Sequence, residues 1–281
     1  ICDELAQLLT VIDDETTAAQ AGRPAPADYQ YRSSPKTLRG GYYETTMAEA
    51  ATGATTQRPV IFAGYGHFNG AAADIEWFHN VEANTIQFET GPEHFITGEN
   101  PDGSFIINPA PAKDFAKILE RAWASNVTVI FLLSPHYYPE WALTRHPEAA
   151  WNSGSFLRYD IQHPYSRKLL KAYLAALVPA LRNSPGAGAL HSFCISNEPA
   201  YRPSLRNPFT RERFIQYLKK RYHGDLAKLN AAWDIHATSF AAAIPATDPT
   251  IDTPAKGQFQ DFCIFKAEEF TDWHTWLATT I

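Results

Sequence analysis

The chain has 281 residues, of which 45% are hydrophobic, and its formal net charge is −6. This length and apolar content suffice for one large folded domain or two small ones. A mildly acidic chain without basic blocks argues against nucleic acid as the main partner. No apolar run approaches the ~20 residues of a membrane-spanning helix. The sequence begins at Ile1 without a signal peptide, so it indicates no compartment.

The cysteines point to no cofactor chemistry. Cys2, Cys194 and Cys263 are odd in number and lack the close spacing of metal ligands or redox pairs. We therefore expect neither a disulfide framework nor a zinc site, and we predict that the protein needs no cofactor.

The first 58 residues differ in character from the rest. Residues 1–20 carry apolar side chains at helical spacing, including Leu5, Leu9 and Ile12. Residues 21–58 are rich in Ala, Pro, Gly, Thr and Ser, a composition typical of irregular structure. We predict an N-terminal helix and linker over residues 1–58.

From residue 59 onward, strand and helix patterns alternate. The predicted strands are residues 58–64, 84–89, 127–133 and 189–195. The predicted helices are residues 71–81, a helix opened by Pro111, residues 165–182, 209–222, 225–233 and 258–278. The third strand is an uninterrupted apolar run of the kind that buried parallel strands show. Repeated strand–helix units of this kind predict an α/β fold with a parallel sheet wrapped by helices.

Each predicted strand ends in polar or aromatic residues, and four strands that deliver such groups to one rim are typical of a (β/α)8 TIM barrel. A doubly wound sheet is the alternative, but no Gly-rich phosphate loop follows the first strand. A closed barrel needs eight strand–helix units, whereas only four are recognisable here. We therefore predict that residues 59–281 form the first half of a barrel.

The fourth predicted strand ends in Asn197 and Glu198, and Pro199 then stops it. A carboxylic acid at the carboxyl end of a barrel strand lies where active sites form. Cleavage of a glycosidic bond needs a proton donor there, beside a group that can bind a sugar hydroxyl. The alternative is an exposed strand-end glutamate without a catalytic role.

Residues 131–150, FLLSPHYYPEWALTRHPEAA, resemble the third-strand region of glycoside hydrolase family 42, the β-galactosidase type with (β/α)8 barrels. The matching motifs are Ser134-Pro135, Pro139-Glu-Trp141 and His146-Pro147-Glu148. The Asn197-Glu198 pair also matches the family pattern, and residues 209–233 resemble its following helical segment.

The resemblance implies a retaining mechanism with two carboxyl groups. By this resemblance Glu198 is the acid/base and Asn197 binds the sugar 2-hydroxyl. The family's nucleophile is a Glu at the end of the seventh strand, which we expect to lie outside this chain. Glu89, Glu93 and Glu140 are other carboxylates near the predicted rim. Of these we expect Glu89 to bind a sugar hydroxyl, or a neighbouring Lys or Arg, rather than to act as the nucleophile.

Five further residues are candidates for substrate binding. His67 and His136 stand at strand ends, where a structural role is nearly as well supported for each. Tyr138 and Trp141 lie in the loop after the third strand, where an aromatic ring could form a platform for a sugar, although Trp141 could equally pack beneath that loop. Tyr201 lies three residues beyond Glu198 and could position that acid.

The sequence departs from the family at the first two strands. Gly64-Tyr-Gly-His67-Phe replaces the usual first-strand motif, and Glu89 ends a strand where the family usually places an Arg. The sugar is therefore left open between a β-galactoside and another glycan. A non-catalytic carbohydrate-binding or interaction protein derived from such a barrel is the alternative function. Carbohydrate is the expected partner, and a homo-oligomer or pairing with the missing half of the barrel is left open.

Overall fold

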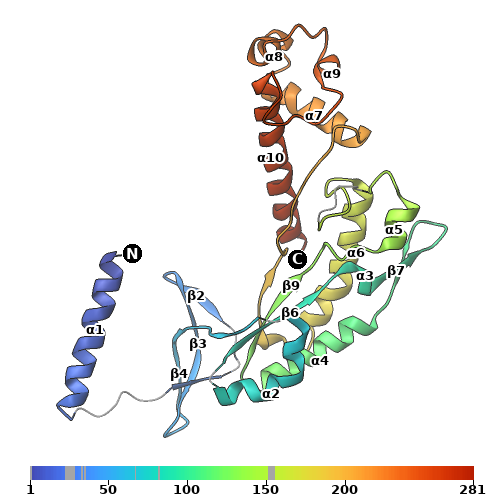
Figure 1. The fold of residues 1–281 in the computed structure, drawn as a ribbon. Coiled ribbons are helices and arrows are strands. Elements are labelled where there is room, and N and C mark those ends of the chain that lie inside the picture. Colours follow the sequence, from blue (N-terminus) through green and yellow to red (C-terminus); the bar gives the residue numbers. More distant parts are fainter. Residues whose placement is uncertain are drawn as a thin grey trace. The chain divides into compact units, whose positions relative to one another are not determined.

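The computed structural model describes residues 2–22, 29–32, 34, 36–66, 68–81, 83–150 and 156–281. The chain divides into two compact units, Ile1–Phe62 and Ala63–Ile281. Figure 1 shows the elements of both units. Among the described helices, none combines the length and apolarity needed to cross a bilayer.

The first unit contains the predicted helix and a sheet that the sequence reading missed. Helix α1 is Cys2–Gln20. Strands β1 (Tyr29–Tyr31), β2 (Thr37–Arg39), β3 (Tyr42–Glu49) and β4 (Thr55–Val60) form an antiparallel sheet with the order β1-β3-β2, and β4 also pairs with β3. The predicted irregular segment 21–58 therefore contains β1, β2, β3 and most of β4 among its described residues, and the predicted barrel strand 58–64 is split. Its first residues end β4, and only Gly64–Tyr65 join the parallel sheet.

The second unit is built on a parallel sheet of four strands with the order β10-β9-β6-β5. The strands are β5 (Gly64–Tyr65), β6 (Thr85–Thr90), β9 (Thr128–Leu133) and β10 (Leu190–Cys194). Neighbouring strands in space are also consecutive parallel strands along the chain, and this is the order at the start of a (β/α)8 barrel. The parallel order predicted from the alternating pattern is confirmed.

Helical elements connect the strands, but the predicted helix 71–81 is a single α-helical turn flanked by 3₁₀ helices. The connections begin with η1 (Phe68–Asp74), α2 (Ile75–Phe78) and η2 (His79–Val81), and continue with α4 (Ala110–Ala124), α6 (Pro164–Arg182) and η3 (Ala187–Ala189). After β10 the chain forms α7 (Pro208–Arg221), α8 (Leu226–Trp233), α9 (Phe240–Ala243) and α10 (Lys256–Thr280). Short elements that the sequence reading missed are α3 (Pro92–Phe95), α5 (Glu140–Arg145) and the hairpin of β7 (Ile96–Glu99) and β8 (Phe105–Ile107).

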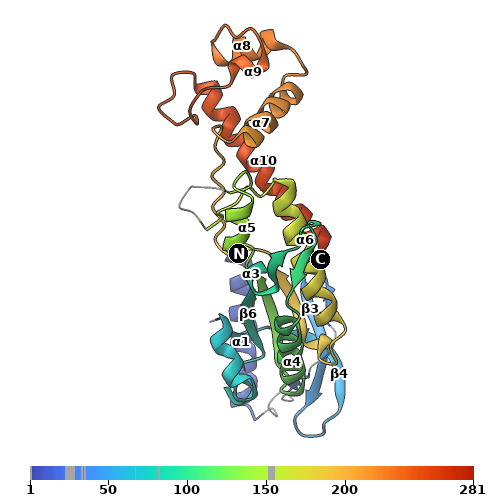
Figure 2. The same cartoon turned by 90° about the vertical axis from the view of Figure 1, so that its right-hand side faces the viewer.

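Two apolar clusters hold the second unit together. The first joins one face of the parallel sheet, through residues such as Phe88 and Phe131, to the inward faces of α4 and α6 and to the last turns of α10. The second lies among α7, α8, α9 and the first half of α10, around Phe214 and Trp233. Figure 2 shows α10 running from the α7–α9 region down to α6. Helix α10 therefore contributes to both clusters.

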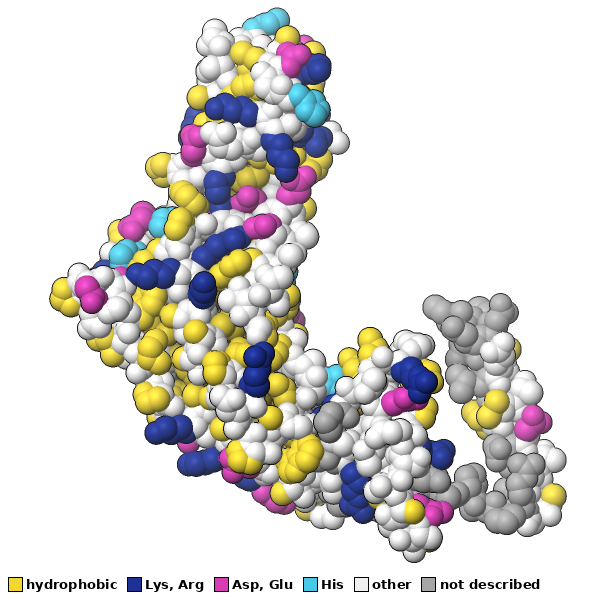
Figure 3. Space-filling view, turned by 180° about the vertical axis from the view of Figure 1, so that it is seen from behind, with side chains coloured by type: hydrophobic (Ala, Val, Ile, Leu, Met, Phe, Trp, Pro, Cys, Tyr) yellow, Lys and Arg dark blue, Asp and Glu magenta, His cyan; other side chains and the backbone are white. Residues whose placement is uncertain are grey.

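The space-filling view shows hydrophobic side chains gathered over the body of the second unit, whereas charged side chains are spread over the helical part formed by α7–α10 (Figure 3). The face drawn in Figure 3 is thus more apolar over the sheet-bearing part than over the helical extension.

Candidate active site

Strand register places four side-chain positions on one face of the parallel sheet at its carboxyl end. Glu89 of β6 pairs with Leu132 of β9, and Leu132 pairs with Cys194 of β10. Residues in register on parallel strands point to the same side, and this side alternates along each strand. Ser134, two residues beyond Leu132, therefore follows Glu89 toward the same rim, and its hydrogen bond to Glu89 agrees with this placement.

Glu89 is the best-anchored carboxylate of this rim. The Ser134 hydroxyl donates to Glu89 Oε2 at 3.0 Å, and the Tyr137 hydroxyl donates to Glu89 Oε1 at 3.2 Å. Burial and the negative charge of Glu89 raise the pKa of Tyr137, so this phenol stays protonated and remains a donor. The loop after β9 thus holds both carboxylate oxygens of Glu89 through hydrogen bonds.

His136 lies beside this carboxylate. Its ring is 8% exposed and contacts the rings of Tyr137 and Phe156, with centroid distances of 4.2 and 5.0 Å. Burial lowers the pKa of His136, although the charges of Glu89 and Glu93 oppose that shift. The imidazole is therefore neutral at pH 7 and has one nitrogen that accepts and one that donates a hydrogen bond.

Glu198 lies just beyond β10, on irregular backbone, and its side chain is exposed. Its backbone has a φ of +40°, in the left-handed region that residues other than glycine seldom adopt. Asn197, the residue before it, is half-buried. The Ser196 hydroxyl lies 2.9 Å from His274 Nε2 on α10, so the segment is tied to that helix one residue before Asn197.

Tyr201 is half-buried and contacts residues of α7 and α10. Arg213 donates to its hydroxyl at 3.2 Å, and its ring stacks on Phe270 with an interplanar angle of 8°. Burial raises the pKa of Tyr201, with a contribution from the nearby carboxylate of Asp160. Its predicted role in positioning Glu198 stays a prediction.

The structure corrects the reading of Tyr138. Its ring is 1% exposed and stacks on Tyr159 at a centroid distance of 4.2 Å, so it faces the core and offers no face to a sugar. Trp141 likewise packs against the first apolar cluster and donates from Nε1 to the Ile96 carbonyl, which is the packing alternative. Both rings pack beneath the loop because burying their apolar surface is more favourable than exposing it to water.

The remaining candidates divide as follows. His67 lies outside the described residues. Glu93 and Glu140 are exposed, and Glu140 forms an ion pair with Arg158. Within the described part of the chain, no group of three or more His, Cys, Asp or Glu side chains could hold a metal ion.

Sequence reasoning missed two sets of residues around the rim. Ser134 and Tyr137 sit in the loop already recognised as important, and the strand-end rule applied residue by residue could have included them. No sequence signal marked His274, since nothing in a helical pattern near the end of the chain indicates contact with a strand end 78 residues earlier.

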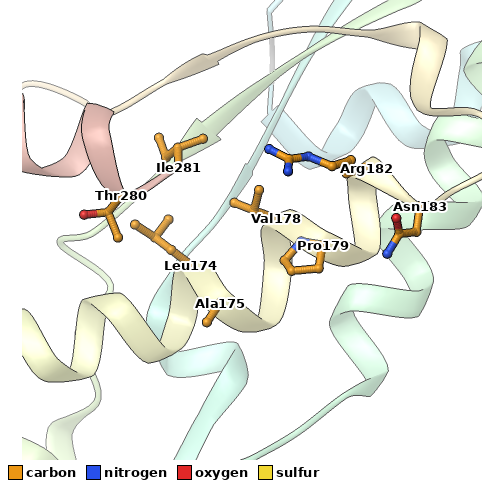
Figure 4. A pocket seen from close by; sticks show the side chains of 8 residues that line it. All are labelled: Leu174, Ala175, Val178, Pro179, Arg182, Asn183, Thr280 and Ile281. Atoms are coloured by element: carbon orange, nitrogen blue, oxygen red, sulfur yellow. The ribbon is translucent and has the colours of Figure 1, made fainter.

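A groove of about 310 Å³ runs between the second half of α6 and the end of α10, where Leu174, Val178 and Ile281 form its apolar wall beside Arg182 (Figure 4). None of the residues that line this groove is among the rim residues described above.

The sequence model of glycoside hydrolase family 42, described as β-galactosidase, matches residues 104–281. This chain belongs to glycoside hydrolase family 42. The match includes residues 131–150, Asn197, Glu198 and the helices that follow, and it confirms the resemblance seen in the sequence. A comparison with curated proteins found no match.

Three solved structures share the fold of this family 42 chain. They are the cold-adapted β-galactosidase from Rahnella sp. R3 (17% identity, TM-score 0.58), the β-galactosidase from the psychrophilic Marinomonas ef1 (16%, 0.57) and that from the haloarchaeon Halorubrum lacusprofundi (16%, 0.59). The alignments cover 78%, 78% and 77% of this chain but 33%, 35% and 34% of those chains, respectively. This family 42 chain thus spans about a third of the length of these structures, and its (β/α)8-type fold, seen here in part, is confirmed.

Proposed function

We propose that this chain supplies the acid/base part of a retaining β-glycosidase active site, with Glu198 as the acid/base residue. The observation that supports this most is the position of Asn197 and Glu198 at the carboxyl end of the fourth parallel strand, within a region that matches family 42. That end of a barrel is where catalytic side chains gather.

The chemistry assigns each group a step. In a retaining reaction one carboxyl protonates the leaving oxygen while a second carboxylate, about 5–5.5 Å away, attacks the anomeric carbon. Glu198 then removes a proton from the water that releases the sugar. Its side chain is exposed, so the carboxyl is accessible to a glycosidic oxygen.

The neighbouring side chains fit sugar binding. The half-buried Asn197 would bind the 2-hydroxyl, whose hydrogen bond strengthens as positive charge develops on the ring. Glu89, held by Ser134 and Tyr137, presents fixed acceptor oxygens for another hydroxyl. Neutral His136 adds a donor or an acceptor. The proposed nucleophile is a glutamate outside this chain, and the proposed substrate is a β-galactoside or a related β-linked glycan.

The test is Glu198→Gln in the complete natural polypeptide, assayed with aryl β-galactosides. We expect kcat/KM for the phenyl glycoside to fall about 10²–10⁴-fold, because general acid assistance is lost. For the dinitrophenyl glycoside kcat/KM should fall far less, because its dinitrophenolate leaving group departs without a proton. Added azide should restore turnover of the glycosyl-enzyme. The matched control is Glu212→Gln, because Glu212 is exposed on α7 and hydrogen-bonded only locally to Gln216.

An unchanged profile for Glu198→Gln would refute the acid/base assignment. Binding of β-linked oligosaccharides by the wild type, with no turnover of either aryl glycoside, would instead support a non-catalytic carbohydrate-binding role.

A further inference from the structure

The segment that carries Glu198 has no regular structure of its own. Residues 195–204 form neither helix nor strand, and Glu198 within them has the left-handed φ of +40°. A strained conformation of this kind persists only where surrounding contacts fix the backbone on both sides. One contact on each side of Glu198 leads to α10.

The first contact lies before Glu198. Ser196 Oγ is 2.9 Å from His274 Nε2, and His274 Nδ1 is 2.9 Å from the Phe270 carbonyl oxygen. A carbonyl only accepts hydrogen bonds, so Nδ1 carries the proton and donates to Phe270. In the neutral ring Nε2 is then an acceptor, and the Ser196 hydroxyl donates to it. The helix thus fixes both the tautomer of His274 and the direction of the Ser196 side chain.

The second contact lies after Glu198. The Tyr201 ring stacks on Phe270 at a centroid distance of 6.2 Å, and Arg213 donates to the Tyr201 hydroxyl. Arg213 is itself held by Asp160 at 3.2 Å and by Glu269 at 2.8 Å. The chain on this side of Glu198 is therefore anchored through a ring contact and a buried ion-pair network.

Phe270 and His274 are four residues apart on α10, so they occupy the same face of that helix. The His274 ring also packs edge-on against Phe270 at a centroid distance of 4.4 Å. One face of α10 therefore contacts the chain two residues before and three residues after Glu198.

We propose that His274 and Phe270 are positioning residues, which hold Ser196 and Tyr201 so that the Glu198 carboxyl points at the glycosidic oxygen. This inference rests on the proposed function and adds residues to it that do not touch the substrate. The helix itself is anchored independently by Trp273 and Leu277, which are buried in the first apolar cluster. Replacement of His274 therefore loosens the Glu198 segment and leaves α10 packed.

The test compares His274→Ala with the neighbouring control Thr275→Ala in the complete natural polypeptide. Thr275 is exposed, and its hydroxyl donates to the Thr271 carbonyl within its own helix. For His274→Ala we expect kcat/KM to fall tenfold or more for the phenyl β-galactoside but less than threefold for the dinitrophenyl glycoside. Only cleavage of the phenyl glycoside, which has the poorer leaving group, depends on the position from which Glu198 donates its proton.

Two further variants separate positioning from simple damage to the fold. Ser196→Ala removes the same hydrogen bond with a smaller change and should reproduce the selective loss. His274→Gln offers an amide oxygen to Ser196 and should restore much of the phenyl glycoside activity. Nitrogen-15 shifts of His274 should show a proton on Nδ1 in the wild type, and the Nε2 shift should move in Ser196→Ala.

Equal losses on both glycosides, no loss in either variant, or an Nε2-protonated His274 would overturn the positioning role. A wild type that cleaves neither glycoside would overturn the proposed function and this role with it. A wild type that is active and sensitive to Glu198→Gln, yet indifferent to His274→Ala, would overturn the positioning role alone.

Discussion

Replacement of Asp160 by Ala should be among the most destabilising single changes in the second unit. The Asp160 side chain is fully buried and accepts hydrogen bonds from Thr210 at 2.9 Å and from the backbone N–H of Gln162 at 2.9 Å. Arg213 lies 3.2 Å from both of its oxygens. Removing one member of a buried ion pair costs about 3–5 kcal/mol, because the other charge is left uncompensated.

The remaining contacts set where in that range the effect falls. Arg213 keeps its ion pair with Glu269, which offsets part of the loss, whereas the buried Thr210 hydroxyl loses its acceptor. These terms are coupled and do not add independently. We therefore expect Asp160→Ala to lower the free energy of unfolding by about 3 kcal/mol. Asp160→Asn should cost less, since its amide oxygen still accepts from Thr210.

Urea unfolding followed by circular dichroism measures this effect. The control is Asp114→Ala, which removes an exposed pair with Lys117 at 3.7 Å and should change stability by less than about 0.5 kcal/mol. If Asp160→Ala stays within about 1 kcal/mol of the wild type, the ion-pair network does not support the fold in the way described here.

Three further predictions concern single groups. Burial raises the pKa of Glu269 to about 7, so the folded state holds the proton of this carboxyl more tightly than the unfolded state. The free energy of unfolding should therefore fall as pH rises from about 4.5 to 7. In urea titrations at several pH values, Glu269→Gln should make this pH dependence weaker. Gly186→Ala should destabilise the protein by about 1–3 kcal/mol, because a Cβ there would lie 2.3 Å from the backbone carbonyl of Leu119; a loss too small to measure in urea would contradict this packing. His136 should titrate below the ordinary imidazole pKa of about 6.5 in NMR spectra because burial lowers its pKa, and a midpoint above that value would mean that the nearby carboxylates dominate.

The sequence was most informative where one physical signal was strong. The apolar run 127–133 predicted a buried parallel strand, and β9 occupies Thr128–Leu133 between two parallel neighbours. The helical spacing after Pro111 predicted α4 to within a residue of its start. These elements were predictable because burial on both faces of a strand, or on one face of a helix, leaves a direct periodic trace.

The sequence was least informative for short strands and for side-chain direction. The antiparallel strand β3 contains Thr45 and Ala48 as its buried residues, which is too weak an alternation to predict a strand from composition. Tyr138 was expected at the rim because of its loop position, but its ring turned inward to stack on Tyr159. Contacts such as Ser196 with His274 depend on how distant elements pack, and local pattern carries no record of that.

Helix α10 should make the two apolar clusters of the second unit unfold together. Phe262 and Phe265 belong to the second apolar cluster, and Trp273 and Leu277 belong to the first, on a single uninterrupted helix. Opening the middle of a helix breaks backbone hydrogen bonds to the residues before and after it. Loss of packing in one cluster therefore destabilises the part of α10 that belongs to the other cluster. The amides of α10 should therefore exchange with solvent as one block, and the segment that carries Glu198 gains its order only when both clusters are formed.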